Sequence, residues 1–312
     1  MTFLTKGRSV RIAAPVFVAC IGLAAAGCSS SSSSSSSTAA TSPSATSSAS
    51  TTASGDVDVF SAGSLDTLMT KTVGPAFHAA TGYTLVDTSH GSGTLEASIK
   101  DKTAVADVFV SASPADDAGL MGSANGDWVS WYASFAASPE VLGYYPASKF
   151  ANDLKTMPWY KVITLPGFRL GRTDPTQDPG GVLADEALNE TATAQHLPAL
   201  KTLATEQSDV YSENPEEADI QTGQLDAAFM YEADANSQGS PFVKLTGTSL
   251  AGDYTIALIK NAPHEAAAEA FIKFLLGSSG QAEMKADNFE IVSPAKVTGS
   301  GVPSSLTSLL SS

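Results

Sequence analysis

Residues 57–65 read Val-Asp-Val-Phe-Ser-Ala-Gly-Ser-Leu and place a strand, a turn and the start of a helix directly after one another. Val57 and Val59 alternate with other residues as in a β-strand, and Gly63 permits a tight turn. Beyond the turn, apolar residues recur at helical spacing. The sequence therefore predicts that Ser64 lies at the N-terminus of a helix that follows a strand.

A serine at this position has two interpretations. The first turn of a helix carries unpaired N–H groups and the positive end of the helix dipole, so a hydroxyl beside them makes an uncharged site for an anion. Alternatively, Ser64 only caps its helix and stabilises it by about 1 kcal/mol.

The same arrangement recurs about thirty residues later. Residues 84–86 form a predicted strand, and residues 91–95, Gly-Ser-Gly-Thr-Leu, open a second predicted helix with Ser92 in the position of Ser64. Successive βαβ units of a parallel sheet place such turns at the same carboxyl edge. We therefore expect the two helix N-termini to face one point.

A third predicted strand, 107–111, completes a β-α-β-α-β series, which is typical of a doubly wound α/β lobe. Further strands are expected at 140–146 and 254–261, lying side by side as the crossings of a hinge between two lobes. One lobe would contain residues 56–139 and 261–312, and the other residues 140–260. An aromatic cluster could stack a sugar or base, but packing in the core is favoured for its members, Trp128, Trp131, Tyr132 and Phe135.

The N-terminus has the pattern of a secretory signal. Three basic residues precede an apolar run over 12–26, and small residues lead to Cys28, as in the lipobox of bacterial lipoproteins. Cys20 is a rival cleavage site, but it would leave the apolar region too short. We expect a signal peptide over 1–27, a lipidated Cys28, and a flexible Ser/Thr-rich tether over 28–55.

Charge and cysteine content exclude several partners. The leader holds three of the 17 basic residues and none of the 32 acidic ones, so the remaining chain carries a formal charge of −18. Nucleic acid and anionic lipid are therefore unfavourable partners. Both cysteines lie in the leader region, which leaves no cysteine in the remaining chain for an internal disulfide or a thiolate metal site.

Seven segments resemble, in order and spacing, the substrate-binding proteins of molybdate and tungstate ABC transporters. The resemblance covers nearly everything from residue 57 to residue 294. The segments are 61–65, 91–95, 106–112, 131–136, 169–181, 226–235 and 267–281.

The resemblance implies a two-lobed periplasmic-binding-protein fold of type II, with a doubly wound sheet in each lobe and the ligand in the cleft. An oxyanion would be bound by the hydroxyls of Ser64, Ser92 and Tyr231 and by the backbone N–H of Gly180. A further N–H donor is expected near Asn214. A site of neutral donors would suit a fully deprotonated tetrahedral oxyanion and would leave the proton of monohydrogen phosphate without an acceptor.

Asp178 leaves two binding modes open. In the archaeal-type branch of the family, an aspartate at this position ligates the metal centre together with a glutamate, whose matching position here is Met230. One carboxylate without its partner favours tetrahedral binding, with Asp178 as a hinge residue or a helix cap. Direct ligation by Asp178 remains the alternative.

The resemblance also implies an extracytoplasmic, lipid-anchored monomer without enzymatic activity or cofactor, which delivers molybdate or tungstate to an ABC permease and its ATPase. Another small solute, such as sulfate or a carboxylate, would use the same fold. A more distant alternative is a lipid-anchored serine hydrolase that uses Ser92 and His90, although no Gly-x-Ser-x-Gly motif supports it.

Overall fold

The computed structural model describes residues 54–207, 210–212 and 215–311, which belong to one compact unit. Several predicted features lie outside the described residues: the signal peptide, Cys28, all but the last two residues of the tether, and Asn214.

The strands are β1 (Asp56–Ala62), β2 (Thr84–His90), β3 (Val108–Ser111), β4 (Trp131–Tyr144), β5 (Leu170–Thr173), β6 (Val210–Tyr211), β7 (Ala227–Tyr231), β8 (Phe242–Lys244), β9 (Ala251–Leu258), β10 (Glu290–Gly299) and β11 (Leu310–Ser311). The helices are α1 (Asp66–Leu68), α2 (Gly74–Thr81), α3 (Ser92–Lys100), α4 (Pro114–Leu120), α5 (Ala151–Thr156), α6 (Trp159–Val162), α7 (Pro179–Ala194), α8 (Pro198–Thr205), α9 (Pro215–Thr222), α10 (Glu232–Ser237), α11 (Glu265–Leu276) and α12 (Ser278–Ala286).

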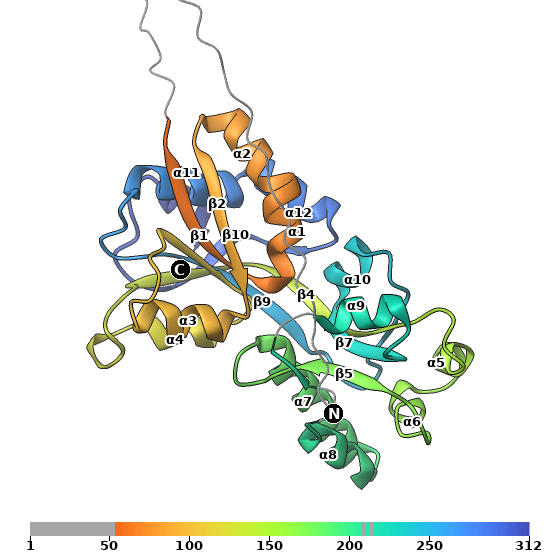
Figure 1. Ribbon diagram of the computed structural model, residues 1–312. Coiled ribbons are helices and arrows are strands. Elements are labelled where there is room, and N and C mark those ends of the chain that lie inside the picture. The colour runs from red at the N-terminus through yellow and green to blue at the C-terminus, as the bar shows by residue number, and fades with distance from the viewer. Residues whose placement is uncertain (1–53, 208–209, 213–214, 312) are drawn as a thin grey trace, which may run out of the picture. The chain divides into compact units, whose positions relative to one another are not determined.

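The first part of the sheet is built on β1, as the opening stretch of the sequence predicts. Strand β1 lies between β2 and β3 and is parallel to both, so the predicted β-α-β-α-β series is confirmed. Strand β9 adds to β3 in the antiparallel direction, and β4 follows β9 (Figure 1). The last residues of β1 and β2, Ala62 and His90, are partners in the sheet, so both strands end at the same edge.

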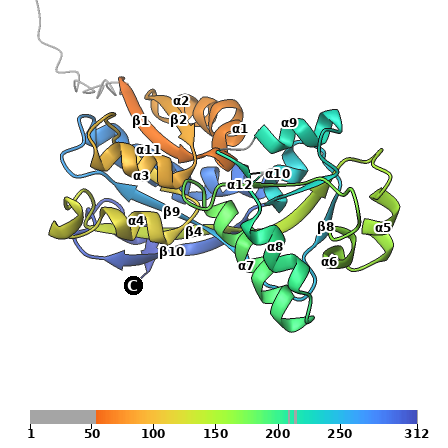
Figure 2. The same ribbon diagram turned by 60° about the horizontal axis from the view of Figure 1, so that its bottom comes forward.

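Alternating side chains of these strands supply two separate cores. Val57 and Val59 pack with α2, α11 and α12 on one face of the sheet. Phe60 and Phe109 point to the other face and pack with residues of α3 and α4. These two helices lie next to each other (Figure 2). Burial on both faces is the arrangement that helical crossovers between parallel strands produce.

Strand β4 joins two groups of strands. Its residues 131–139 pair with β9 and β10, and its residues 140–144 pair with β7 and β8. Beyond β7, strands β5 and β6 continue the sheet in parallel. A further core forms where β4 and β7 meet α5, α6, α7 and α8. The division into lobes at residues 139–140 and 260–261 stays a prediction.

The start of β4 differs from what the sequence predicts. Residues 131–139 are already strand, and it is residues 133–139 and 251–256 that lie side by side, not 140–146 and 254–261. Trp131 and Phe135 face one core and Tyr132 faces the other, so burial on both faces hides the alternation that would mark a strand. The preference for core packing is confirmed for these three aromatic residues, which are all buried.

A run of helical turns from Gly63 to Thr81 follows β1. It consists of a 3-10 turn (Gly63–Leu65), α1, a π-helical turn (Met69–Val73) and α2. Among the described residues, no helix has both the length and the apolar character needed to cross a membrane.

Candidate functional site

Ser64 lies within the first helical turn after β1 and does not cap it. The N-cap position is Ala62, and the Ser64 hydroxyl instead forms a 2.9 Å hydrogen bond with the Tyr254 hydroxyl. Tyr254 comes from β9 and is completely buried. The interpretation of Ser64 as a simple N-cap is therefore wrong, and Tyr254 is a site residue that the sequence did not predict.

Ser92 is the first residue of α3 and is completely buried. Its hydroxyl oxygen accepts a 3.1 Å hydrogen bond from the backbone N–H of Ala112, directly after β3. Ser64 and Ser92 thus follow the paired ends of β1 and β2. The predicted placement of both serines at the carboxyl edge of the sheet is confirmed.

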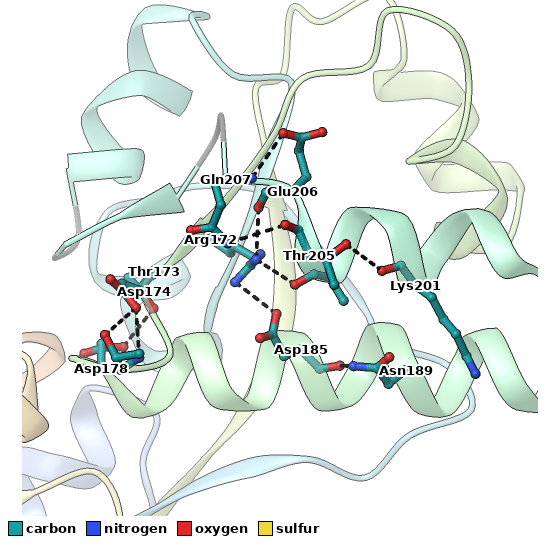
Figure 3. A network of polar contacts seen from close by, with 12 residues as sticks. Arg172, Thr173, Asp174, Asp178, Asp185, Asn189, Lys201, Thr205, Glu206 and Gln207 are labelled. Atoms are coloured by element: carbon teal, nitrogen blue, oxygen red, sulfur yellow. Dashed lines mark hydrogen bonds and ion pairs between the residues drawn. The ribbon is translucent and has the colours of Figure 1, made fainter.

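Asp178 is the N-cap of α7. Its Oδ1 accepts a 2.8 Å hydrogen bond from the Gly180 N–H and a 2.9 Å hydrogen bond from the Thr173 hydroxyl (Figure 3). The expectation that Asp178 caps a helix is therefore confirmed. In this structure the Gly180 N–H, the predicted backbone donor, points to that carboxylate.

The segment before α7 lies against the start of α3. The Gln177 carbonyl accepts a 3.0 Å hydrogen bond from the Gly93 N–H and a 3.4 Å hydrogen bond from the Thr94 N–H. The backbones approach so closely that a Cβ atom on Gly91 would lie 2.5 Å from the Gln177 oxygen. This contact brings Asp178 next to the helix that begins with Ser92.

Tyr231 ends β7 beside the same group. Its ring meets the Tyr254 ring edge to face with the centroids 5.7 Å apart, and a Cβ atom on Gly180 would lie 3.8 Å from its Cζ. The Tyr231 hydroxyl is buried and has no hydrogen-bond partner among the residues that the structure describes. Burial and the nearby Tyr254 raise the pKa of Tyr231 well above its ordinary value, so the hydroxyl keeps its proton.

The five residues predicted at the site are therefore drawn together by a continuous set of contacts. Ser64 reaches Tyr231 through Tyr254, Tyr231 borders Gly180 and Asp178, and the Gln177 contact links Asp178 to the start of α3. We call the set formed by Ser64, Ser92, Asp178, Gly180, Tyr231 and Tyr254 the donor cluster.

A second carboxyl group, Glu140, faces the donor cluster and was not predicted. It is the direct partner of Tyr231 in the pairing of β4 with β7 and is only 4% exposed. Neither of its carboxyl oxygens has a hydrogen-bond partner within the described part of the chain. Burial, and then the charge of Asp178, raise its pKa well above the ordinary value for glutamate. The expectation of a single carboxylate at the site is thus corrected.

Met230 does not belong to the site. Its side chain packs with Val141 and Ala228 in a core separate from the one that holds Tyr231. Successive residues of a strand point to opposite faces, so Tyr231 points away from the core that holds Met230. Glu140 is paired with Tyr231 and therefore shares its face, which is directed toward the donor cluster. The sequence does contain a signal for Glu140, because it is the single acidic residue in the otherwise apolar segment 139–144 at the end of β4.

Two cavities flank the donor cluster. One of about 200 Å³ is lined by Asp178 and, among others, Ser113, Asp116 and Asp253. The other, of about 150 Å³, lies beside Ser64 and includes Asp234 in its lining. The first cavity is acidic, and burial raises the pKa of Asp116 to about 7. Each cavity borders one residue of the donor cluster, Asp178 in the first and Ser64 in the second.

The chemistry of the cluster is that of neutral hydrogen bonding. Hydroxyl groups come from β1–α1, α3, β7 and β9, and the charged group, Asp178, accepts hydrogen bonds from its own helix start. Such an arrangement can surround a small polar solute without binding it covalently.

The chain matches the profile of a protein family described as bacterial extracellular solute-binding protein over residues 57–290. An uncharacterized solute-binding protein of Halobacterium salinarum is 30% identical over 219 residues, which cover 69% of this chain and 68% of that protein. The molybdate/tungstate-binding protein WtpA of Thermococcus kodakarensis is 23% identical over 236 residues, which cover 59% of this chain and 66% of that protein.

The solved structures show the fold. The periplasmic molybdate-binding protein of Azotobacter vinelandii aligns with a TM-score of 0.58 at 18% identity and covers 75% of this chain and 98% of its own. The expected α/β fold, that of the type II periplasmic binding proteins, is confirmed. From its match over three quarters of its length, the chain belongs to the family of bacterial extracellular solute-binding proteins.

Proposed function

We propose that this protein captures a tetrahedral oxyanion, molybdate or tungstate, outside the cytoplasm for an ABC importer. The observation that carries the proposal is the Tyr231 hydroxyl, which lies beside the Ser64–Tyr254 pair and the start of α7 and is buried without a partner among the described residues. A buried donor without an acceptor costs about 1–3 kcal/mol, and a bound oxyanion would supply the acceptor. The kinship with WtpA supports the choice of ion.

Neutral donors suit such an ion in an acidic protein. The screening length at physiological salt is about 8 Å, so a buried dianion responds mainly to the groups that touch it. The carboxylate of Asp178 already accepts two hydrogen bonds from Gly180 and Thr173, and these reduce its repulsion of a bound anion. Tetrahedral coordination by hydroxyl and N–H donors is therefore the mode we propose.

The remaining elements of the proposal follow from the family. The protein acts as a binder and not as an enzyme, works as a monomer, and presents the closed form to a permease and its ATPase. Cys28 holds it to the membrane by a lipid. The contact of Gln177 with the start of α3 supports a mechanism in which two lobes close over the ligand.

The direct test is calorimetric titration of the purified protein with molybdate, tungstate, sulfate and phosphate. Molybdate and tungstate should bind and raise the melting temperature, because a ligand that binds only the folded state stabilises it by about 4 kcal/mol at a thousandfold excess over Kd. Phosphate should do little. Preferential binding of sulfate would reassign the solute within the same fold. If none of the four ions binds, the proposal is refuted.

Asp178→Asn tests the coordination mode. If the oxyanion is tetrahedral, the variant should bind as well as the wild type or better, because a like charge near a dianion is removed while the amide oxygen still accepts from Gly180. Loss of binding in this variant, with normal folding, would mean that the carboxylate ligates the metal centre.

A further inference from the structure

Two polar groups lie opposite each other on β4 and β7, and both are buried without a hydrogen-bond partner in residues 54–207, 210–212 and 215–311. They are the Glu140 carboxyl, 4% exposed, and the Tyr231 hydroxyl, whose residue is 5% exposed. Directly paired residues of antiparallel strands carry their side chains on the same face, so both groups point toward the donor cluster. Helix α7, which Asp178 caps, packs over this face of β4 and β7.

The surroundings of Glu140 exclude a structural ion pair within the described part of the chain. The titratable groups that interact with it are Asp178 on α7, Tyr231 on β7 and Tyr254 on β9, and all of these are acids. Asp234 on α10, also an acid, acts on the two tyrosines. Arg172 on β5 is occupied by Asp185 and by the carbonyls of Ala204 and Glu206 (Figure 3).

A buried carboxyl group that no described residue hydrogen-bonds requires a physical explanation. A buried polar group without a partner costs about 1–3 kcal/mol, and an apolar residue of similar size would avoid that cost. Val141 and Leu142, the next residues of the strand, are buried without such a penalty. The carboxyl group is therefore best explained by a partner that arrives from outside the protein.

We propose that Glu140 is a ligand-binding residue which, as an uncharged carboxylic acid, donates a hydrogen bond to the bound oxyanion beside the Tyr231 hydroxyl. The inference rests on the proposed function and names a further residue of the same site. A neutral acid has one O–H donor, which matches an oxyanion oxygen that carries no proton. The same group in its charged form would repel a dianion.

The proposal couples affinity to pH. Burial and the Asp178 charge raise the pKa of Glu140, so the acid keeps its proton well above the ordinary range for glutamate. When the pH exceeds that pKa, the carboxylate must take up one proton from solvent at a carboxyl oxygen before it can donate to the ligand. Affinity should then fall by up to tenfold per pH unit, and binding should be accompanied by uptake of up to one proton.

The experiment compares the wild type with Glu140→Gln and Glu140→Met in molybdate titrations from about pH 5.5 to about pH 9, above the ordinary glutamate pKa of about 4.3. Glu140→Gln keeps a donor of the same shape and should bind at all pH values within about threefold of the wild type at low pH. Glu140→Met removes the donor and should lose roughly tenfold to a hundredfold in affinity. Without ligand, both variants should melt at or above the wild-type temperature, a result that a structural role would not give.

Asp87→Asn is the matched control. Asp87 is another shielded carboxyl, with a pKa of about 7 raised by burial, but it accepts a hydrogen bond from Ser61 and lies outside the donor cluster. This variant should keep the wild-type affinity and its pH profile. Proton uptake by the wild type, measured in two buffers of different ionisation enthalpy, gives a test that depends on no variant.

Three results would overturn the inference. One is unchanged affinity in Glu140→Met, and another is a loss of affinity in Glu140→Gln at low pH as large as the loss in Glu140→Met. The third is tight binding of phosphate that Glu140→Gln abolishes, which would make Glu140 an acceptor for a protonated oxyanion. If the wild type binds no molybdate at any pH, the proposed function itself fails, so the two failures are distinguishable.

Discussion

Tyr231 shows at the level of one residue how a binding site can lower the stability of its own fold. Its ring is well packed against Tyr254, whereas its hydroxyl has no acceptor in the part of the chain that the structure describes. Tyr254 differs, because its hydroxyl is satisfied by Ser64. The two tyrosines touch each other, yet we expect their hydroxyls to affect folding with opposite sign.

Tyr231→Phe should therefore stabilise the free protein and weaken binding. Removing a buried hydroxyl without a partner should raise the free energy of unfolding by about 1 kcal/mol or more, while a lost donor to a charged oxygen costs roughly tenfold to a hundredfold in affinity. Chemical denaturation and calorimetric titration measure the two effects. Tyr254→Phe serves as the contrast and should destabilise the free protein, because it leaves Ser64 without its partner. Equal affinity of Tyr231→Phe and wild type for molybdate would remove Tyr231 from the site.

Site residues could be predicted from the sequence where the pattern that marks them is contiguous along the chain, and not where it depends on distant strands. Ser64 and Ser92 follow from a strand, a turn and a helix that are contiguous in sequence, so their positions were predicted from the residues alone. Tyr231 and Asp178 were predicted from the family resemblance. Glu140 was missed because its proximity to Tyr231 depends on the register between strands about ninety residues apart, which no local pattern encodes.

At the level of elements, the contact between the start of α3 and the segment before α7 requires a glycine at position 91, because any side chain there would prevent it. A Cβ atom on Gly91 would lie 2.5 Å from the Gln177 carbonyl oxygen, which is backbone and cannot rotate away. The Gly93 and Thr94 N–H groups donate to the same oxygen. This contact is the structural basis for the closure that we propose.

Gly91→Ala should therefore hold the two segments apart. We expect the folded protein to persist, because α3 and its core contacts through Leu95 and Ile99 are untouched, but to bind molybdate at least tenfold more weakly. Small-angle scattering with saturating ligand should show a more open form than the wild type. Ser98→Ala, on the same helix, is the control and should close normally. Wild-type affinity in Gly91→Ala would show that the contact is not part of closure.

The same distinction between local and distant signals applies to the elements. Strands β1, β2 and β3 were predicted because each belongs to an alternation of strand and helix with clear turns. Residues 131–139 of β4 were not, because burial on both faces removes the polar alternation of a strand. The pairing of β4 with β9 was expected a few residues from where it occurs, since the register is fixed by tertiary packing and not by a turn.

At the level of the whole molecule, acidity and burial combine to set a pH dependence of stability. Asp87 and Asp116 have pKa values raised to about 7 by burial, and burial also raises those of Asp117 and Glu140 well above their ordinary values. Above about pH 4 the unfolded chain releases these protons while the folded chain retains them. Stability must then fall as the pH rises from about 4 to about 7. His264 acts in the same direction, because hydrogen bonding to Asp107 raises its pKa and its contribution is lost as the pH rises through that value.

The free protein should consequently melt at a higher temperature near pH 5 than near pH 8, although most proteins of ordinary composition are most stable between about pH 5 and pH 8. Calorimetry across this range checks the slope. The double variant Asp87→Asn with Asp116→Asn should flatten the profile between about pH 4 and about pH 7, because two of the retained protons disappear.

Asp226 limits the stability of the protein in acid. Burial raises its pKa, but hydrogen bonds from Arg169 and Ser148 outweigh this effect and lower the pKa overall, so its contribution to the free energy of unfolding is lost only as the pH falls through that lowered value. A melting temperature that rises steadily from pH 5 to pH 8 would show that the buried acids Asp87 and Asp116 do not retain their protons in the folded state.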